Sequence, residues 1–173
     1  EKFFNEFGAA FKEGIYEDFE RKKSLLDISL FKSTNSENLT SLSEYISRMQ
    51  DEQNEIFYIS GESVDQILTS PQVEGFKSRG LEVLYMIDPI DEFWLPSMNE
   101  YEGKTFKSIT KGVVDLSKFD LNDDKETKKK KPATKKDIDN LISEMKNHLG
   151  DKVKDIKSSQ MLTNSPVCLT ADE

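Results

Sequence analysis

The residues best suited to chemistry lie in one acidic run, Asp88-Pro89-Ile90-Asp91-Glu92, that follows a predicted strand. Three carboxylates close together could hold a cation or take part in acid–base catalysis. Acidic side chains are also favoured in the first turn of a helix, where the helix dipole attracts negative charge. The run therefore leaves two interpretations open: a reactive cluster and the electrostatic start of a helix.

Two adjacent aromatic residues, Phe93 and Trp94, follow this run directly. Successive side chains on a helix point about 100° apart, so the two rings cannot easily face the same core. We expect one of them to be exposed and, with Met98 close by, to form an apolar surface that contacts other chains. The alternative is that neighbouring layers bury both rings.

The remaining reactive residues are isolated. His148 is the only histidine and Cys168 the only cysteine, which excludes an internal disulfide and a multi-histidine or cysteine-based metal site. We expect His148 to be exposed near a helix end and Cys168 to be a small buried hydrophobe. The chain has no glycine-rich phosphate loop, zinc-protease motif or nucleophile elbow. We therefore assign no catalytic, cofactor-binding or metal-binding residue and predict no enzymatic activity for this chain.

The composition of the chain argues against membrane and nucleic-acid partners. The 173 residues carry a net charge of −9 and are 35% hydrophobic. No stretch approaches the roughly 20 apolar residues of a membrane span, and the acidic total argues against nucleic acid as a partner. From the residues at its two ends we also expect the chain to be a fragment of a longer protein.

Charge divides the chain unevenly. Residues 1–124 carry −12, residues 125–136 carry +6 and residues 137–173 carry −3. The basic block contains no large apolar residue, so it cannot offset the entropy cost of ordering and is predicted to be a solvated linker. The alternative is a basic patch for an acidic partner.

Hydrophobic spacing predicts an α/β fold that opens with a helical coil. Residues 1–50 are expected to form three short helices. The first carries an apolar stripe at Phe3, Phe7, Phe11 and Ile15; the second carries Leu25, Leu26, Leu30 and Phe31; the third opens with a capping box at Ser41 and Glu44.

The next segment predicts a parallel β–α–β unit. Strands are expected at 56–60, 81–87 and 106–110, with helices that begin at Ser63 and Ser70 and a helix end at Gly80. The expected result is a small three-layer α/β/α unit behind the helical coil.

The last segment predicts one helix between Thr134 and Gly150, then strands at 153–158 and 167–170. Residues 137–173 have too little apolar surface for a core of their own, so we expect them to be the first part of a second, α+β domain. The predicted organisation is therefore 1–115 (a coil over 1–50 and the α/β/α unit over 51–115), a linker over 116–136 and a further domain over 137–173.

Several long motifs resemble the middle domain of the ninety-kilodalton heat-shock chaperones, in particular their bacterial branch. The resemblance covers about residues 1–115 in the expected order, and residues 161–166 resemble the passage into the C-terminal domain of that family. The motifs are Phe4-Asn5-Glu6-Phe7-Gly8, Leu39 through Met49, Ile56 through Ser63, Gly80 through Leu84, Asp88 through Glu92, and Tyr101-Glu102-Gly103-Lys104.

The resemblance implies a cytoplasmic, homodimeric, ATP-dependent clamp that assists the folding of unfolded client proteins. It places ATP and magnesium in an N-terminal domain and dimerisation in C-terminal helices, neither of which this chain contains, so no cofactor is expected here. It implies client contact at Glu92, Phe93 and Trp94. Two alternatives remain: a module that only couples domain motions, and an α/β enzyme with a metal held by Asp88, Asp91 and Glu92.

Overall fold

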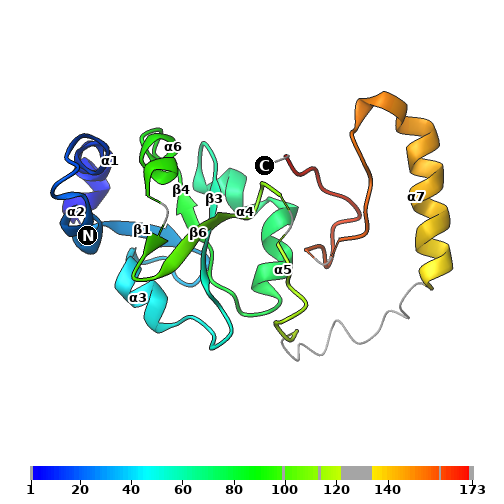
Figure 1. The fold of residues 1–173 in the computed structure, drawn as a ribbon, viewed down its shortest axis with the longest axis horizontal. Helices are drawn as coiled ribbons and strands as arrows, with labels where there is room; N and C mark the ends of the chain where they lie inside the picture. Colours follow the sequence, from blue (N-terminus) through cyan, green and yellow to red (C-terminus); the bar gives the residue numbers. More distant parts are fainter. Residues whose placement is uncertain (1, 99, 113, 122–133, 160, 172–173) are drawn as a thin grey trace.

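The computed structural model describes residues 2–98, 100–112, 114–121, 134–159 and 161–171. These residues form a mixed α/β structure with a six-stranded sheet and several short helices (Figure 1). In chain order the elements are α1 (Lys2–Glu17), α2 (Lys22–Ile28), β1 (Leu30–Ser33), β2 (Thr40–Ser41), α3 (Leu42–Ser47), β3 (Glu55–Ser60), α4 (Val64–Leu68), η1 (Pro71–Val73), α5 (Glu74–Lys77), β4 (Leu84–Met86), α6 (Asp91–Trp94), η2 (Leu95–Ser97), β5 (Glu100–Tyr101), β6 (Lys104–Ser108), α7 (Lys135–Leu149) and η4 (Gly150–Lys152).

The sheet has the strand order β2-β1-β4-β3-β6-β5 and mixes parallel with antiparallel pairs. The central strand β3 pairs in parallel with β4 on one side and with β6 on the other. The pairs β1–β4, β1–β2 and β5–β6 are antiparallel. The helices α4, η1 and α5 connect β3 to β4, which confirms the predicted parallel β–α–β unit.

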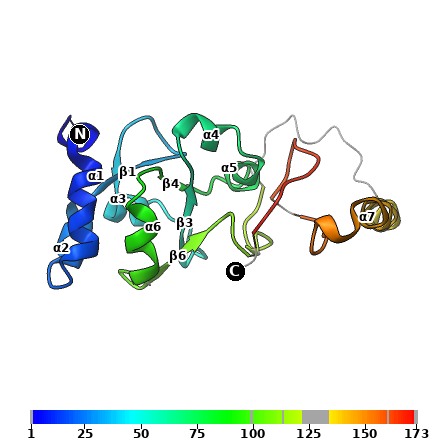
Figure 2. The same cartoon turned by 90° about the horizontal axis from the view of Figure 1, so that it is seen from above.

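Side chains of β3 and β4 are buried on both faces of the sheet, which explains why these strands are nearly continuous runs of apolar residues. Alternate residues point to opposite faces, so neighbours such as Ile56 and Phe57 enter different core clusters. One cluster is covered by α1, α2, α3 and α6, and the other by α4, η1 and α5, as the two perpendicular views show (Figures 1 and 2).

Local start and stop signals work as the sequence predicts. The Ser41 hydroxyl accepts from the Glu44 amide and the Glu44 carboxylate accepts from the Ser41 amide, which completes a capping box. The Ser63 hydroxyl caps α4 in the same way, although the Gln66 side chain binds the amide of Glu62 instead. Gly80 has φ of +66°, the backbone conformation expected of a helix-ending glycine.

The predicted helical coil over residues 1–50 is wrong in part, because this region also supplies two strands. Helix α2 ends at Ile28, where the Ser29 hydroxyl bonds to the carbonyl of Leu25. Leu30 and Phe31, which helical spacing had placed on that helix, belong instead to β1. Pairing of β1 with β4, more than 50 residues later in the chain, overrides the local helical pattern.

Only part of the predicted apolar stripe of α1 is buried. Phe3 and Phe7 are exposed, and the face packed against the core carries Gly8, Lys12 and Ile15. These three residues are four and three positions apart, so they too follow helical spacing. Ile15 belongs to both sets and Phe11 is half-buried, so hydrophobic spacing predicted the buried face only toward the C-terminal end of this helix.

The C-terminal part keeps its predicted helix but not its predicted strands. Thr134 and Asp137 form a complete capping box, and α7 ends at Gly150. Among the described residues, 153–158 and 167–170 form no strand; Ala171 makes a single isolated bridge with Lys111. Both segments have the apolar content of strands, but no neighbouring strand supplies a ladder of hydrogen bonds.

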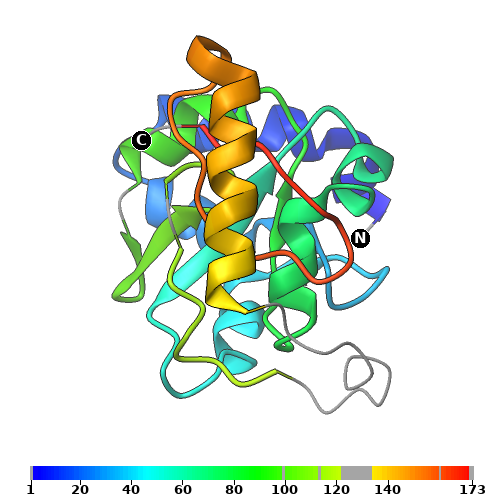
Figure 3. The ribbon, with the colours of Figure 1, turned by 90° about the vertical axis from the view of Figure 1, so that its right-hand side faces the viewer.

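The packed core extends past the predicted boundary at residue 115. Leu116 and Phe119 lie in the cluster beneath α4 and α5. Met161, which follows α7 in the chain, belongs to the same cluster. The helix α7 has no buried residue and stands apart from the sheet (Figures 1 and 2). Seen from that end of the molecule, α7 lies in front of the sheet and its covering helices (Figure 3).

One buried hydroxyl links α3 to β3 and to the segment that precedes β4. The Tyr45 hydroxyl donates to the carbonyl of Glu82 at 2.9 Å, and it accepts from the backbone amide of Phe57 at 2.9 Å and from the side-chain amide of Gln53 at 3.0 Å. Burial raises the pKa of Tyr45, so this hydroxyl stays protonated and able to donate.

Tyr45→Phe is expected to lower the free energy of unfolding by about 1–3 kcal/mol, because it leaves two buried donors and one acceptor without their partner. Urea denaturation measures the change. Tyr16→Phe, at a ring that is 46% exposed, is the control and should change stability little. Equal stability of the two variants would contradict this role for the Tyr45 hydroxyl.

Candidate functional site

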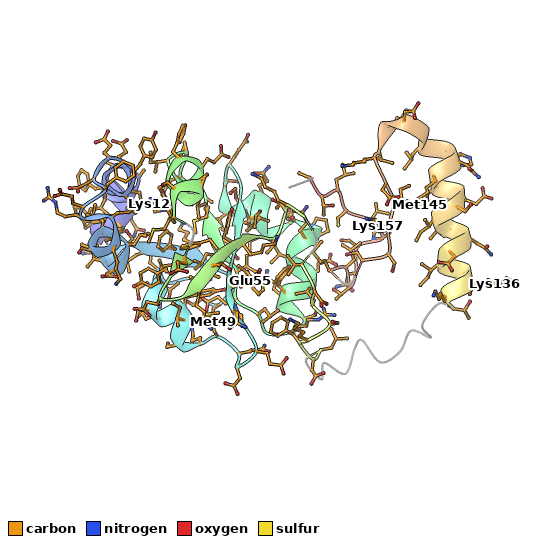
Figure 4. The ribbon with its side chains drawn as sticks, in the orientation of Figure 1. Lys12, Met49, Glu55, Lys136, Met145 and Lys157 are labelled. Carbon is orange, nitrogen blue, oxygen red and sulfur yellow. The ribbon has the colours of Figure 1, made fainter. Side chains whose placement is uncertain are left out.

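The acidic run that opens α6 is neutralised by a buried lysine. The Lys12 ammonium lies 2.8 Å from Asp88 Oδ2 and 3.1 Å from Asp91 Oδ1. Lys12 is 3% exposed and Asp91 is fully buried. The same ammonium lies 4.7 Å from the centre of the Phe31 ring, a cation–π contact. Figure 4 labels Lys12 on α1, and these contacts join α1 to α6.

Asp91 organises α6 through three kinds of donor. Its carboxylate accepts from the Lys12 ammonium, from the Trp94 indole N–H at 2.8 Å and from the Asp88 amide at 3.2 Å. Burial raises the pKa of Asp91 above its ordinary value, although the Lys12 charge and the indole hydrogen bond act in the opposite direction. A buried carboxylate with these partners fixes the position of the short helix, which at four residues could not form alone.

The indole ring of Trp94 is part of the core. Its exposure is 0%, and its ring lies 5.7 Å from Phe106 in an edge-to-face arrangement and 6.1 Å from Phe31. The following turn, η2, is hydrogen-bonded to α2, because Lys22 donates to the Ser97 carbonyl at 2.8 Å. The Ser97 hydroxyl in turn donates to the Trp94 carbonyl at 2.8 Å.

Phe93 takes the opposite orientation and is 58% exposed. The prediction that one of the two adjacent rings is exposed is therefore confirmed, and the exposed ring is Phe93. Its ring lies 6.0 Å from that of Tyr16 on α1, which is 46% exposed, and Glu92 beside it is exposed as well. Trp94 has no surface to offer a partner in this arrangement. The exposed patch therefore consists of Tyr16, Glu92 and Phe93, hereafter the aromatic patch.

The proposed metal cluster of Asp88, Asp91 and Glu92 does not form. The Lys12 ammonium lies between the carboxylates of Asp88 and Asp91, where a cation would have to bind, and Glu92 points to solvent. The described residues contain no group of three or more carboxylate, histidine or cysteine side chains with the geometry to hold a metal ion. The α/β metalloenzyme interpretation is therefore wrong for this cluster.

Of the two isolated reactive residues, His148 lies where the sequence predicted, whereas Cys168 is neither fully buried nor part of a strand. His148 is exposed in the last turn of α7, with Nδ1 3.0 Å from the carbonyl oxygen of Glu144. Cys168 is half-buried, and burial, together with the charge of Glu74, raises the pKa of its thiol. A raised pKa lowers the reactivity of a thiol at neutral pH.

Sequence reasoning missed Lys12 and Tyr16. The sequence did contain a signal for Lys12, because it lies on the same helix face as Gly8 and Ile15. A lysine on a face that is otherwise buried must be paired with an acidic group.

Among the described residues, no helix is long and apolar enough to cross a membrane.

Comparison with known proteins identifies the family. The family model described as Hsp90 protein matches residues 1–173. The chain therefore belongs to the Hsp90 family.

Its relatives include the chaperone protein HtpG of Paramagnetospirillum magneticum, which is 44% identical over 173 residues. HtpG of Wolbachia pipientis is 44% identical over 174 residues. These alignments cover 100% and 99% of this chain but only 28% and 27% of the two relatives. The middle domain of a Plasmodium falciparum heat shock protein has a similar fold, with a TM-score of 0.59 and 37% identity over 64% of this chain and 47% of that one.

Lys12→Met is expected to lower the free energy of unfolding at pH 7 by about 3–5 kcal/mol, because it leaves a buried carboxylate without its counter-charge. Loss of the lysine also raises the pKa of Asp91 further. A raised carboxyl pKa favours the protonated folded state, so the associated stability is present below the unfolded value of about 3.9 and is lost as pH rises through the folded value. The deficit of Lys12→Met should therefore be larger at pH 7 than near pH 4.

Urea denaturation at the two pH values measures this deficit. Lys2→Met, at an exposed lysine on the same helix, is the matched control. A deficit that is the same at both pH values, or no larger than that of Lys2→Met, would contradict the buried ion pair.

Proposed function

We propose that the aromatic patch is a client-contact surface of an Hsp90-type chaperone related to HtpG. The observation that supports it is the pairing of Phe93, 58% exposed, with a neighbour, Trp94, that is 0% exposed. Phe93 and Tyr16 together place two neighbouring aromatic rings at the surface, 6.0 Å apart. Contact with other chains is the function that uses such a surface.

The support of the patch makes the contact effective. Because Asp91 and Trp94 fix α6, Phe93 loses little further freedom when a client binds. Covering one aromatic ring contributes roughly 1–2 kcal/mol, which is too little for stable binding by itself. We therefore propose weak contacts that act together with others along an unfolded chain.

Charge sets a preference among clients. Glu92 is exposed beside Phe93, and the net charge of the chain is −9. An acidic surround speeds the approach of basic segments and repels acidic ones, with an effect that falls as salt rises. We propose that basic segments with exposed apolar side chains are the preferred clients.

The remaining implications concern the whole protein, of which this chain covers little more than a quarter in the relatives. We propose that the whole protein is a cytoplasmic homodimer that binds ATP and magnesium in a domain outside this chain. The division into a middle domain, a linker and the start of a C-terminal domain over 137–173 likewise stays a proposal, with the first boundary moved from 115 to beyond Phe119. Residues 122–133 of the predicted linker lie outside the described residues.

A second candidate function is coupling of domain motions without client contact. It is supported by the return of residues 161–171 to the core beside α5, which connects the segment carrying α7 to the sheet. Client titration separates the two functions, because a coupling module would not respond to an unfolded protein.

Phe93→Ala is expected to weaken binding of an unfolded basic client by about five- to tenfold, since about 1–1.4 kcal/mol of contact is lost. Fluorescence anisotropy of a labelled, reduced and alkylated ribonuclease measures the dissociation constant. Urea denaturation should show that the fold is unchanged, because Phe93 is outside both core clusters.

Leu68→Ala is the control, since Leu68 is 50% exposed on α4, which covers the other face of the sheet. It should leave the dissociation constant unchanged. Trp94→Ala does not serve this purpose, because removing a fully buried aromatic ring costs about 3–5 kcal/mol of stability. Equal affinity of Phe93→Ala and the unaltered chain would refute client contact at the aromatic patch.

A further inference from the structure

An extended segment after α7 is bound along α5 by one carboxylate. Glu74 Oε2 accepts hydrogen bonds from three successive backbone amides, those of Thr163 at 3.0 Å, Asn164 at 2.9 Å and Ser165 at 3.1 Å. Its other oxygen, Oε1, accepts from the Ser165 hydroxyl. Three consecutive amides that converge on one anion form a compact anion-binding turn, and here the anion belongs to the same chain.

The neighbouring residue, Gly75, fixes the path of the segment. The Gly75 amide donates to the Met161 carbonyl at 2.7 Å, and Gly75 is buried. A Cβ atom at this position would lie 2.6 Å from both Cα and O of Met161, closer than real side chains approach. The segment can therefore pack here only because residue 75 has no side chain.

The rest of the segment is held mainly by its main chain. Gln72 donates to the Leu169 carbonyl, and Ala171 exchanges backbone hydrogen bonds with Thr110 and Gly112. Met161 is the one buried side chain of 161–171, and Leu169 is 81% exposed. Binding through one anchor side chain, one carboxylate and backbone groups is a mode of peptide recognition, and it leaves most of the segment free to detach.

The position of this contact gives it control over α7. The core cluster includes Phe119 before α7 and Met161 after it, and α7 itself has no buried residue. Figure 4 shows Met145 on α7 and Lys157 on the returning segment at the side of the molecule away from α1. Lys146 and Asp155 form an ion pair at 2.7 Å, which joins α7 to the returning segment rather than to the sheet.

We propose that residues 72–75 form a docking site for an extended peptide, occupied here by residues 161–171 of the same chain, and that Glu74 determines whether the segment carrying α7 stays attached to the sheet. Release of the segment would free α7 at its C-terminal end. It would also remove Leu162 and Thr163 from the wall of an open hollow of about 480 Å³, which Leu116 and Phe119 line as well. The site is thus a releasable connection between the two parts of the chain.

The attachment does not respond to pH in the neutral range. Desolvation by burial raises the pKa of Glu74, but the hydrogen bonds from the Ser165 hydroxyl and the three amides lower it overall to about 2. A lowered pKa contributes stability that is present above the ordinary value near 4.5 and is lost as pH falls through about 2. The site therefore stays occupied unless another partner competes for it.

Amide hydrogen exchange of the intact 173-residue chain, with Glu74→Gln and Gly75→Ala as variants, tests the proposal. Glu74→Gln removes the charge and one acceptor oxygen, whereas Gly75→Ala displaces the segment by steric contact without a change of charge. In both variants we expect the amides of residues 163–165 to exchange about tenfold faster or more. Glu62→Gln, at an exposed carboxylate close by in the chain, is the control and should change nothing.

Two further readouts make the outcome decisive. Amides of β3 should keep their exchange rates, and NMR relaxation should show that α7 tumbles more independently of the sheet in both variants. Unchanged exchange at 163–165 would overturn the docking site. Faster exchange throughout β3 would show that Glu74 merely stabilises the fold, and unchanged relaxation of α7 despite a released segment would overturn its control by Glu74.

Discussion

The arrangement of the proposed contact surface depends on one buried charge. The Lys12 ammonium, on the core-facing side of α1, neutralises Asp91 at the start of α6, and Asp91 in turn binds the indole N–H of Trp94. A buried ammonium or carboxylate alone would be strongly unfavourable, so each requires the other. Because a four-residue helix has no stability of its own, this pair determines which face of α6 is buried. The exposure of Phe93 is the consequence, since adjacent helical residues point in different directions.

The two parts of the chain use charge in contrasting ways. At α6 a carboxylate is paired with a lysine inside the protein and fixes an element permanently. At α5 the carboxylate of Glu74 binds backbone amides of a segment that lies about 90 residues later and is otherwise mostly exposed. The first arrangement holds α6 inside the core, and the second is the connection that we propose can open. The two carboxylates lie on opposite faces of one sheet, because Asp91 packs with the cluster covered by α1, α2, α3 and α6 and Glu74 begins α5 over the other cluster.

Local sequence signals predicted the elements that depend on local chemistry. The capping boxes at Ser41 and Thr134, the buried strand β3 and the parallel β–α–β unit could all be read from residues a few positions apart. Short β1 could not, because its hydrogen-bonding partners lie far along the chain. The pairing of adjacent aromatics predicted one exposed ring but not which one, since that choice is made by Lys12, 79 residues before Asp91. The role of Glu74 could not be predicted from the sequence, because most of its partners are backbone amides, which any residue type can supply, about 90 residues later in the chain.

Acrylamide quenching of Trp94 fluorescence tests the central claim most directly, because Trp94 is the only tryptophan of the chain. If Lys12 and Asp91 hold the indole in the core beneath an exposed Phe93, the emission should be blue-shifted, quenching should be weak, and both should stay so when an unfolded client is added. An emission maximum and quenching constant close to those of a solvated tryptophan, or an indole that becomes protected only when the client binds, would contradict the account, because the buried and exposed faces of α6 would then be reversed.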